Sequence, residues 1–268
     1  MRSALFISAN TPSMMLAAHA YESDAIFYDL EDSVALSDKR SARFLLEEHL
    51  KTHPLKVPSY VRINAVDHEA FDEDMNMLIR LNHLDILLPK ASVKALHHCL
   101  SVHPKARIFA LCETPEVFFE LPEVAKHPSV VGLMLGGEDL ALALDAPKPT
   151  HPEALLFARS QLLYAAKAYG KWALDTPYTH FQDEAGLIED IHRAKRLGFD
   201  GKAAIHPSQL PIIQTHFSPT QEALEEAQAI IDIHEKTNQV RFSYQGKMVD
   251  QPILTKAYRL LKKKDLQS

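Results

Sequence analysis

The sequence has few cysteines and no long apolar run. Of its 268 residues only Cys99 and Cys112 are cysteines, and they form no CxxC pair. This argues against a disulfide framework and a zinc–cysteine site, and it suits a reducing compartment. No stretch approaches the roughly 18 apolar residues of a membrane span, and the apolar run near the N-terminus is too short for a signal sequence. We therefore expect a cytoplasmic protein that does not bind membranes.

Basic residues are not in excess either. Lys and Arg number 29 against 35 Asp and Glu, a formal charge of −6. Without a large basic field, the chain is not expected to bind nucleic acid. Apolar residues make up 46% and charged residues 24%, as in soluble globular proteins. A chain of this length can bury a full core without disulfides or structural metals.

Short apolar runs of β-favouring residues recur along the chain. There are eight, at 4–9, 25–32, 59–65, 84–91, 107–114, 130–140, 171–176 and 200–207. Helix-like stretches lie between most of them, for example at 38–51, 67–81, 152–169 and 183–197. Near-continuous apolar runs separated by helices are typical of parallel strands buried on both faces. The count predicts an α/β fold, a (β/α)8 TIM barrel; a doubly wound open sheet is the alternative.

The C-terminal residues fall outside this eightfold pattern. A helix-like stretch at 219–236 is expected to close the eighth unit, which gives a catalytic barrel over 1–236 and an extension over 237–268. Within the extension, 240–246 alternates like an exposed strand, and a helix with an apolar stripe follows Pro252. We expect this strand and helix to pack on the barrel or on a neighbouring subunit.

Polar residues cluster where the predicted strands end. In a parallel barrel these ends form one rim, where active sites lie. The rim residues expected from the sequence are Asp29, Glu31, Asp32, Arg62, Asn64, Lys90, Glu113, Glu138, Asp139, Asp175, Lys202 and His206. Buried charges are costly unless they are paired or bind a metal. We interpret His206 as a hydrogen-bonded loop residue rather than a ligand.

Glu113 and Asp139 end neighbouring strands and can reach one point. Two carboxylates completed by water or substrate oxygens are a usual Mg²⁺ arrangement. The alternative is that both pair with Lys90 or Arg62. The adjacent glycines Gly136 and Gly137 favour the metal, because they allow close approach of the backbone to a ligand.

Arg62 is the candidate for binding a substrate carboxylate, since its planar guanidinium matches that group. The alternative is an internal ion pair with Glu31 or Asp32, and both roles can coexist. Because side chains alternate along a strand, Asp29 and Glu31 are expected on one face, and Asp32 is expected to orient the following helix.

Several segments together resemble a known family. In order they are RSALFISANTPSMM, AIFYDLEDSVALSDKRSAR, YVRIN, DILLPKA, CET, VVGLMLGGEDLA, LDTPY and GFDGKAAIHPSQ. They resemble the citrate lyase β-subunit-like family, which includes malyl-CoA and citramalyl-CoA lyases and lies within the HpcH/HpaI aldolase superfamily. The resemblance runs from residue 2 to about residue 261, and its longest segments are specific.

The resemblance implies a barrel that binds Mg²⁺ through Glu113 and Asp139. Arg62 would hold the carboxylate of the keto-acid half, Glu113 would also contact substrate, and Glu31 is a further catalytic candidate. The segment Gly246–Pro252 resembles one that reaches an adjacent subunit, so Asp250 would be an acid/base supplied in trans within a trimer or hexamer.

The implied reaction is Mg²⁺-dependent cleavage of a 3-hydroxyacyl thioester of malyl-CoA, citramalyl-CoA or citryl type. The products would be an acetyl thioester and a 2-keto acid. Two alternatives remain: a citryl-acyl-carrier-protein lyase subunit of a larger complex, and a malate-synthase or thioesterase-like activity. The acyl group cannot be named from the sequence, because one methyl group is worth only about 1–3 kcal/mol of discrimination.

The resemblance departs from the family at 8–12. The family usually has a glycine and an arginine before the proline, and these help to hold the phosphate-bearing carrier, whereas this chain reads Ser-Ala-Asn-Thr-Pro. Lys39, Arg40 and Arg43 are nearby candidates for phosphate contacts, and a solvated helix face is the alternative interpretation.

Overall fold

The computed structural model describes residues 1–83, 85–146, 151, 153 and 155–265, with side chains to residue 262. Parts of the predicted strand 84–91, the predicted helix 152–169 and the extension 237–268 lie outside the described residues. The chain divides into two compact units, Met1–Phe217 and Ser218–Ser268.

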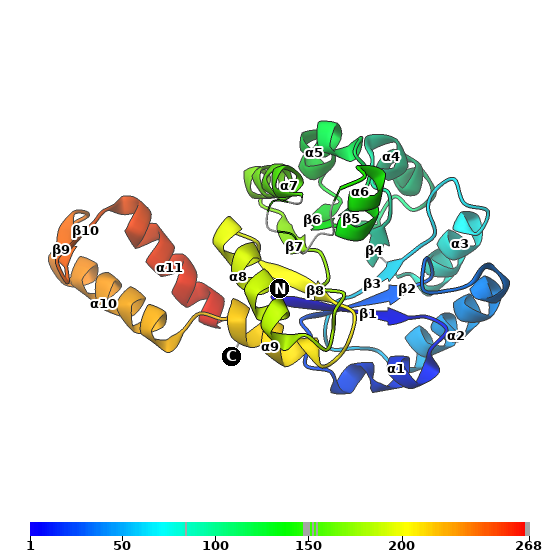
Figure 1. Ribbon diagram of the computed structural model, residues 1–268, viewed down its shortest axis with the longest axis horizontal. Helices are drawn as coiled ribbons and strands as arrows, with labels where there is room; N and C mark the ends of the chain where they lie inside the picture. Colours follow the sequence, from blue (N-terminus) through cyan, green and yellow to red (C-terminus); the bar gives the residue numbers. More distant parts are fainter. Residues whose placement is uncertain (84, 147–150, 152, 154, 266–268) are drawn as a thin grey trace. The chain divides into compact units, whose positions relative to one another are not determined.

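The first unit is a closed barrel of eight parallel strands in sequence order (Figure 1). The strands are β1 (Ser3–Ser8), β2 (Ala25–Asp29), β3 (Ser59–Arg62), β4 (Asp85–Leu88), β5 (Arg107–Cys112), β6 (Val130–Leu135), β7 (Trp172–Asp175) and β8 (Gly201–Ala204). β1 pairs with β8 and closes the ring, with Ser3 opposite Lys202. The TIM-barrel prediction is confirmed, and the open sheet is excluded.

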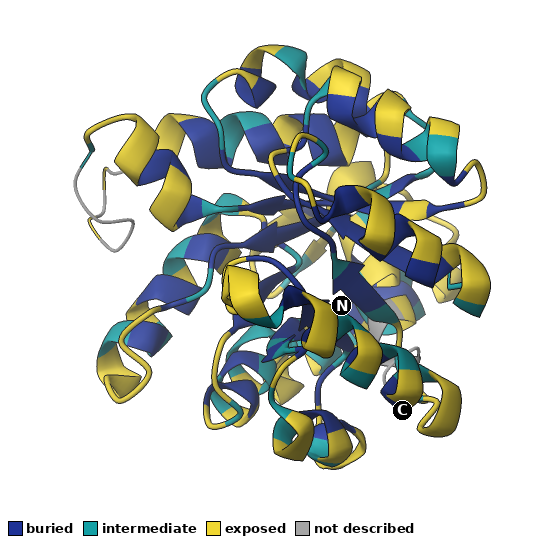
Figure 2. Ribbon diagram, turned by 90° about the vertical axis from the view of Figure 1, so that its right-hand side faces the viewer, coloured by how far each residue is buried: buried dark blue, intermediate teal, exposed yellow. Residues whose placement is uncertain are grey.

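Helices surround the strands. They are α1 (Pro12–Ala17), α2 (Lys39–Thr52), α3 (Phe71–Leu81), α4 (Val93–Val102), α5 (Val117–Lys126), α6 (Gly137–Ala143), α7 (Leu156–Ala168), α8 (Glu184–Leu197) and α9 (Gln209–Phe217). Local signals set several ends: the Ser92 side chain caps the start of α4, and Gly198 ends α8 with φ of 111°. Figure 2 shows buried strands at the centre and exposed outer faces on the helices.

Side chains alternate between the interior of the barrel and the layer between strands and helices. The interior cluster includes Phe27, Tyr60, Phe109, Met134 and Leu174. The three aromatic rings pack on one another with centroids 5.5–5.6 Å apart. They fill the barrel and form an aromatic floor beneath its rim.

One cluster of buried charges lies between β7, β8 and the outer helices, away from the rim. The Lys202 ammonium lies 3.2 Å from Asp175 Oδ2 and 2.6 Å from Asp190 Oδ2, and Arg159 Nε donates to Asp175 Oδ1 at 3.0 Å. All four side chains are almost fully buried. The expectation that Asp175 and Lys202 reach the rim is therefore wrong, because their strand neighbours Leu174 and Ala203 face the interior.

The second unit contains α10 (Gln221–Thr237), the hairpin β9 (Phe242–Tyr244) and β10 (Lys247–Val249), and α11 (Gln251–Asp265). Its small core joins α10 to α11 through Ile230, Ile231, Val249 and Leu254. The boundary therefore lies at 217/218 and not at the expected 236/237, and α9 rather than the 219–236 helix follows the eighth strand.

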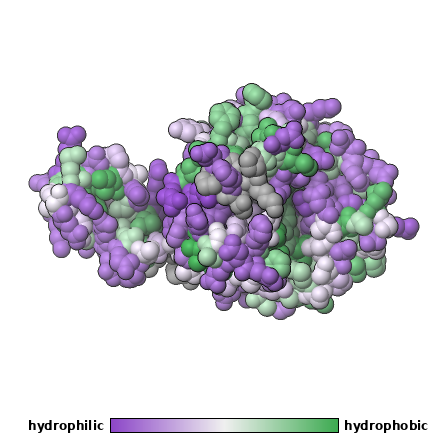
Figure 3. Space-filling model, in the orientation of Figure 1, coloured by the Kyte–Doolittle hydropathy of each residue, from purple (hydrophilic) through white to green (hydrophobic). Residues whose placement is uncertain are grey.

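The described helices include none long and apolar enough to cross a membrane. Over the visible face of the first unit, Figure 3 shows hydrophilic side chains interspersed with smaller groups of apolar residues.

Candidate active site

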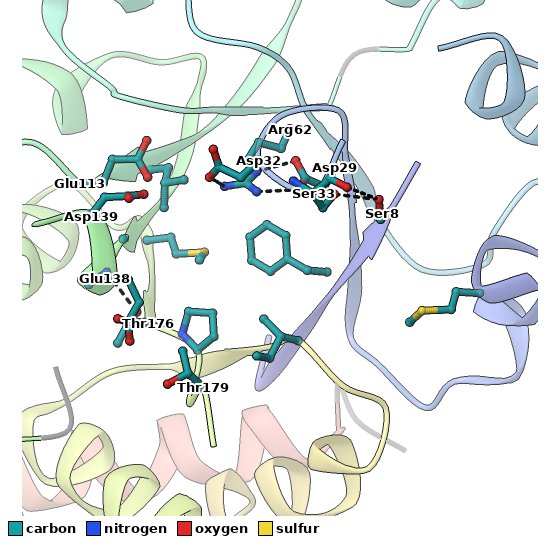
Figure 4. Close-up of a pocket in the computed structure, with 18 residues that line it drawn as sticks. Ser8, Asp29, Asp32, Ser33, Arg62, Glu113, Glu138, Asp139, Thr176 and Thr179 are labelled. Carbon is teal, nitrogen blue, oxygen red and sulfur yellow. Dashed lines mark hydrogen bonds and ion pairs between the residues drawn. The ribbon is translucent and has the colours of Figure 1, made fainter. Parts of the chain in front are cut away.

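A cavity of about 520 Å³ opens at the carboxyl ends of the barrel strands. Strand alternation builds its wall, because the residue two positions after an interior side chain again points inward. Phe27, Tyr60, Leu111 and Leu174 lie in the interior, and Asp29, Arg62, Glu113 and Thr176 therefore line the cavity. Figure 4 shows these polar side chains converging from different strands.

The Arg62 guanidinium lies in a cluster of carboxylates. Its Nε donates to Asp29 Oδ1 at 2.7 Å and its Nη2 to Asp29 Oδ2 at 2.6 Å. Its Nη1 donates to Asp32 Oδ2 at 3.1 Å and lies 3.2 Å from Glu31 Oε2. The internal ion pairs weighed from the sequence are thus present, and Asp29 is the principal partner.

Asp32 does not orient the following helix as expected, because its side chain turns into the cavity toward Arg62. Lys39, at the start of α2, stabilises this loop instead. Its buried ammonium donates to the carbonyls of Leu30 at 2.7 Å and Glu31 at 2.6 Å, and it holds the turn that carries the three carboxylates.

Neither Lys39 nor Arg43 is placed to bind a phosphate. Lys39 is buried on those two carbonyls, and Arg43 pairs with Asp74 and Glu73. Arg40 is exposed. The expected rim residue Asn64 is also buried, with its amide on Asp74 Oδ2 at 2.6 Å. Lys39 and Asn64 instead hold the loop after β2, because both donate to the Leu30 carbonyl.

Glu31 and Glu113 are buried carboxyls with raised pKa values. Burial raises the pKa of Glu31 to about 7, although the Arg62 charge opposes the shift. Burial, reinforced by the negative charges of Glu31 and Asp139, raises the pKa of Glu113 to about 8. Such clusters of perturbed carboxyls are typical of functional sites.

Glu113 faces Asp139 across the strand ends (Figure 4). Glu113 Oε1 accepts a hydrogen bond from the Lys90 backbone N–H at 2.6 Å, and Asp139 lies in the first turn of α6. Within the described part of the chain, neither carboxylate forms an ion pair with a lysine or arginine. The alternative in which Lys90 or Arg62 neutralises them is not seen.

Gly136 and Gly137 make room for side chains of the protein. A Cβ on Gly136 would lie 2.5 Å from Glu113 Cβ and 2.8 Å from its Oε2, and one on Gly137 would lie 2.8 Å from Thr176 Oγ1. Both amides are already bonded: Gly136 N–H donates to the Cys112 carbonyl and Gly137 N–H to Thr176 Oγ1.

The donor set fits a hard divalent cation. Glu113 and Asp139 supply carboxylate oxygens, and both residues line the same cavity. Over the described residues, no three His, Cys, Asp or Glu side chains group as metal ligands. The protein therefore offers two, which is typical of Mg²⁺ sites completed by substrate and water.

Two other expected residues have local hydrogen-bond partners. Asp250 belongs to the second unit, where its Oδ1 accepts from Ile253 N–H and its carbonyl from Leu254 N–H at the start of α11. His206 bonds Ser208 Oγ and stacks on Phe181, as a loop histidine.

Sequence reasoning missed Thr176 and Ser33, which also line the cavity. Thr176 comes two residues after interior Leu174, so the alternation would have identified it once the inward-facing residues of β7 were known. Ser33 follows the acidic turn, where its Oγ bonds Ser8 Oγ at 2.8 Å.

A parallel barrel with an oxygen-rich cavity at its strand ends defines the class, a TIM-barrel protein with an enzyme-like site. A family profile described as HpcH/HpaI aldolase/citrate lyase matches residues 2–207, and one described as a C-C bond lyase of the TIM-barrel fold matches 160–266. The chain belongs to the HpcH/HpaI aldolase/citrate lyase family. This confirms the resemblance found in the sequence and the expected enzyme class, a carbon–carbon lyase.

Individual relatives match between 84% and 98% of the chain. Citrate lyase subunit beta of Haemophilus influenzae is 33% identical, over 98% of this chain and 96% of its own length. A (3S)-malyl-CoA thioesterase of Cereibacter sphaeroides is 34% identical, over 84% and 79%. The protein CitE from Mycobacterium tuberculosis, in complex with magnesium, acetoacetate and coenzyme A, is 31% identical with a TM-score of 0.85, over 97% of both chains.

Proposed function

We propose that this protein is an Mg²⁺-dependent lyase that cleaves a 3-hydroxyacyl-CoA thioester of the malyl or citramalyl type. The products would be an acetyl thioester and a 2-keto acid. The observation that supports this most is a pair of carboxylates, Glu113 and Asp139, which face the cavity that Arg62 also lines. Among the residues that the structure describes, neither carboxylate forms an ion pair with a lysine or arginine. The magnesium, acetoacetate and coenzyme A complex of a similar protein supports the same assignment.

Glu113 and Asp139 would hold the metal ion. Bound there, Mg²⁺ would supply Lewis-acid chemistry: it would lower the pKa of the substrate hydroxyl and stabilise negative charge on that oxygen. The Lys90 N–H keeps one Glu113 oxygen oriented, so the other remains available to the cavity. Asp139, exposed at the start of α6, can adjust to the ion.

Arg62 would bind the substrate carboxylate. Asp29 fixes the plane of the guanidinium through two short hydrogen bonds, so the side chain is held in place before substrate arrives. The Nη1 edge contacts the more exposed Asp32, and a substrate carboxylate can approach there. The same positive charge would stabilise the enolate that leaves when the carbon–carbon bond breaks. The Gly136 and Gly137 amides are bonded within the protein and are not available for this role.

Asp250 of one subunit would exchange a proton with the substrate bound in the barrel of a neighbouring subunit. Its segment, Gly246–Pro252, resembles one that reaches an adjacent subunit in this family, and this likeness supports a contribution in trans. Glu31, whose pKa is raised to about 7 beside Arg62, is the second candidate for moving a proton at neutral pH. This role for Asp250 requires an oligomer, and a trimer or hexamer is our expectation.

Thioester hydrolysis is the second candidate function. The similarity to a (3S)-malyl-CoA thioesterase favours it, because hydrolysis needs the same cavity with water as the final acceptor. The carrier is also part of the proposal. We favour coenzyme A over an acyl carrier protein in a citrate lyase complex, and we place the enzyme in the cytoplasm, where the free thiols of Cys99 and Cys112 would stay reduced.

The test is a lyase assay of the full chain with malyl-CoA, both citramalyl-CoA enantiomers and a citryl thioester, each with and without Mg²⁺. Keto acid and free thiol are measured in parallel. Mg²⁺-dependent keto acid release without free thiol supports the lyase. Free thiol released with malate or citramalate indicates the thioesterase. Activity only on a citryl-acyl-carrier-protein substrate would identify the complex subunit instead.

A further inference from the structure

Thr176 is held from two sides at the end of β7. Its side chain is 2% exposed, and its Oγ1 accepts a hydrogen bond from the Gly137 N–H at 3.0 Å. Its carbonyl accepts from the Lys202 ammonium at 2.6 Å. The residue therefore connects the buried charges behind the barrel to the first residue of α6.

The turn before α6 is packed between two neighbouring strands. Gly136 lies against the Glu113 side chain, which follows β5, and Gly137 lies against Thr176, which follows β7. A Cβ at either glycine would come within 2.8 Å of these side chains. Asp139 follows Gly137 by two residues in the first turn of α6, so the position of the Gly137 backbone determines the position of the Asp139 backbone.

Lys202 is the anchor for this arrangement. Its ammonium is fully buried and is balanced by Asp175 and Asp190, while Arg159 also pairs with Asp175. None of these four residues lines the cavity. Removing one partner of such a buried ion-pair group lowers the stability of the fold, so the Lys202 ammonium is expected to keep its position. The Thr176 carbonyl, which accepts a hydrogen bond from Lys202, is held with it.

We propose that Thr176 is a positioning residue for the metal site. By holding Gly137 it would keep Asp139 on the side of the cavity where Glu113 lies, so that both carboxylates can bind one Mg²⁺. The inference rests on the proposed Mg²⁺ site and adds a residue that would act on it through the Gly137 backbone and not as a metal ligand. Residues behind metal ligands typically change metal affinity by about 10–100-fold when they are replaced.

The experiment compares Thr176→Val with Thr176→Ser in the full chain. Valine keeps the shape and removes the acceptor of the Gly137 hydrogen bond, whereas serine keeps the acceptor. We expect the valine variant to bind Mg²⁺ about 10–100-fold more weakly in calorimetry, and the serine variant to stay within about threefold of wild type. The Gly137 amide should exchange with deuterium faster in the valine variant only.

A matched control separates positioning from loss of stability. Cys99→Ala removes a fully buried side chain in α4, outside the cavity, and should leave the Mg²⁺ dissociation constant unchanged while lowering the melting temperature. If Thr176→Val fails to fold, Thr176→Ala removes the same acceptor without the branched methyl groups and carries the same expectation.

The outcomes distinguish this inference from the function on which it rests. If wild type binds Mg²⁺, Asp139→Ala does not, and Thr176→Val binds like wild type, the role of Thr176 is overturned and the metal site stands. If wild type itself binds no Mg²⁺, both are overturned. Weaker binding in the valine variant with rescue by serine supports the role.

Discussion

Asp29 accepts two hydrogen bonds from Arg62, from Nε at 2.7 Å and from Nη2 at 2.6 Å, and is itself almost fully buried. Asp32 forms another ion pair with the same guanidinium, but its side chain is 66% exposed. Arg62 lowers the pKa of Asp29, although burial alone would raise it. Asp29 is therefore expected to contribute more to the stability of the fold than Asp32.

Asp29→Asn should destabilise the protein far more than Asp32→Asn. Removing one partner of a buried ion pair costs about 3–5 kcal/mol because the other charge stays buried, whereas an exposed pair is worth about 0–1 kcal/mol. Urea denaturation of the two variants at neutral pH measures the difference. Equal free energies of unfolding would contradict the buried bidentate pair as the main support of Arg62.

Asp139→Ala should abolish Mg²⁺ binding and Mg²⁺-dependent activity together. Isothermal titration with MgCl₂ measures the binding, and the lyase assay measures the activity. The control is Glu138→Ala, since that carboxylate is next in sequence but lies toward Thr176 rather than beside Glu113 (Figure 4). Unchanged Mg²⁺ affinity after Asp139→Ala, or loss of binding only in the Glu138 variant, would remove Asp139 from the metal site.

Asp250→Asn should lower the turnover number by about 10²–10⁴-fold, the usual contribution of a general acid or base. The fold should survive, because asparagine can keep the side-chain bond to the Ile253 N–H. Near-wild-type turnover would exclude Asp250 from the mechanism.

A mixing experiment tests whether Asp250 acts in trans. Subunits carrying Asp250→Asn keep an intact barrel, and subunits carrying Asp139→Ala keep an intact Asp250. Each should be inactive alone, and their mixed oligomers should regain activity if one subunit completes the site of another. No recovery in mixed oligomers, confirmed by mass spectrometry, would contradict the contribution in trans.

The pH dependence of stability follows from Glu113. Its pKa is raised from 4.5 to about 8 in the folded protein, mainly by burial. Between these values the folded state keeps a proton that the unfolded state has released, so the stability of the metal-free protein should fall as pH rises through this window. Glu31, raised to about 7, acts in the same direction.

Glu113→Gln should therefore reduce this slope and stabilise the metal-free protein at pH 8, on the order of 3 kcal/mol. Thermal unfolding from pH 4 to pH 9 in a metal chelator measures it, with the exposed Glu138→Gln as the control. An unchanged slope in the Glu113 variant would show that its carboxyl is not held protonated in the folded state.

The barrel was predictable because its strands are apolar on both faces and are separated by helices. Because both faces are apolar, the sequence does not show which residues of a strand face the barrel interior. Leu174 and Asp175 are both buried, one inside the barrel and one behind it, and nothing in a run buried on both faces distinguishes them. Asp175 and Lys202 were therefore misplaced at the rim, and Thr176 was missed.

The carboxylates at the ends of β5 and β6 were found because parallel strands in a barrel all end on one side. Lys39 could not be placed in the same way. A lysine at the start of an amphipathic helix is typical of a solvated face, and only the packed structure shows its ammonium on the carbonyls of Leu30 and Glu31. The unit boundary depended on packing too, because the sequence alone does not show that the apolar face of α10 packs on α11.

The aromatic floor of Phe27, Tyr60 and Phe109 has a kinetic consequence. Because these rings fill the barrel below the cavity, molecules enter and depart through the mouth above it. When two products occupy a cavity with one opening, the product bound nearer the aromatic floor leaves after the other. Product inhibition should then follow an ordered pattern, with the deeper product released last and the same compound binding first in the reverse direction.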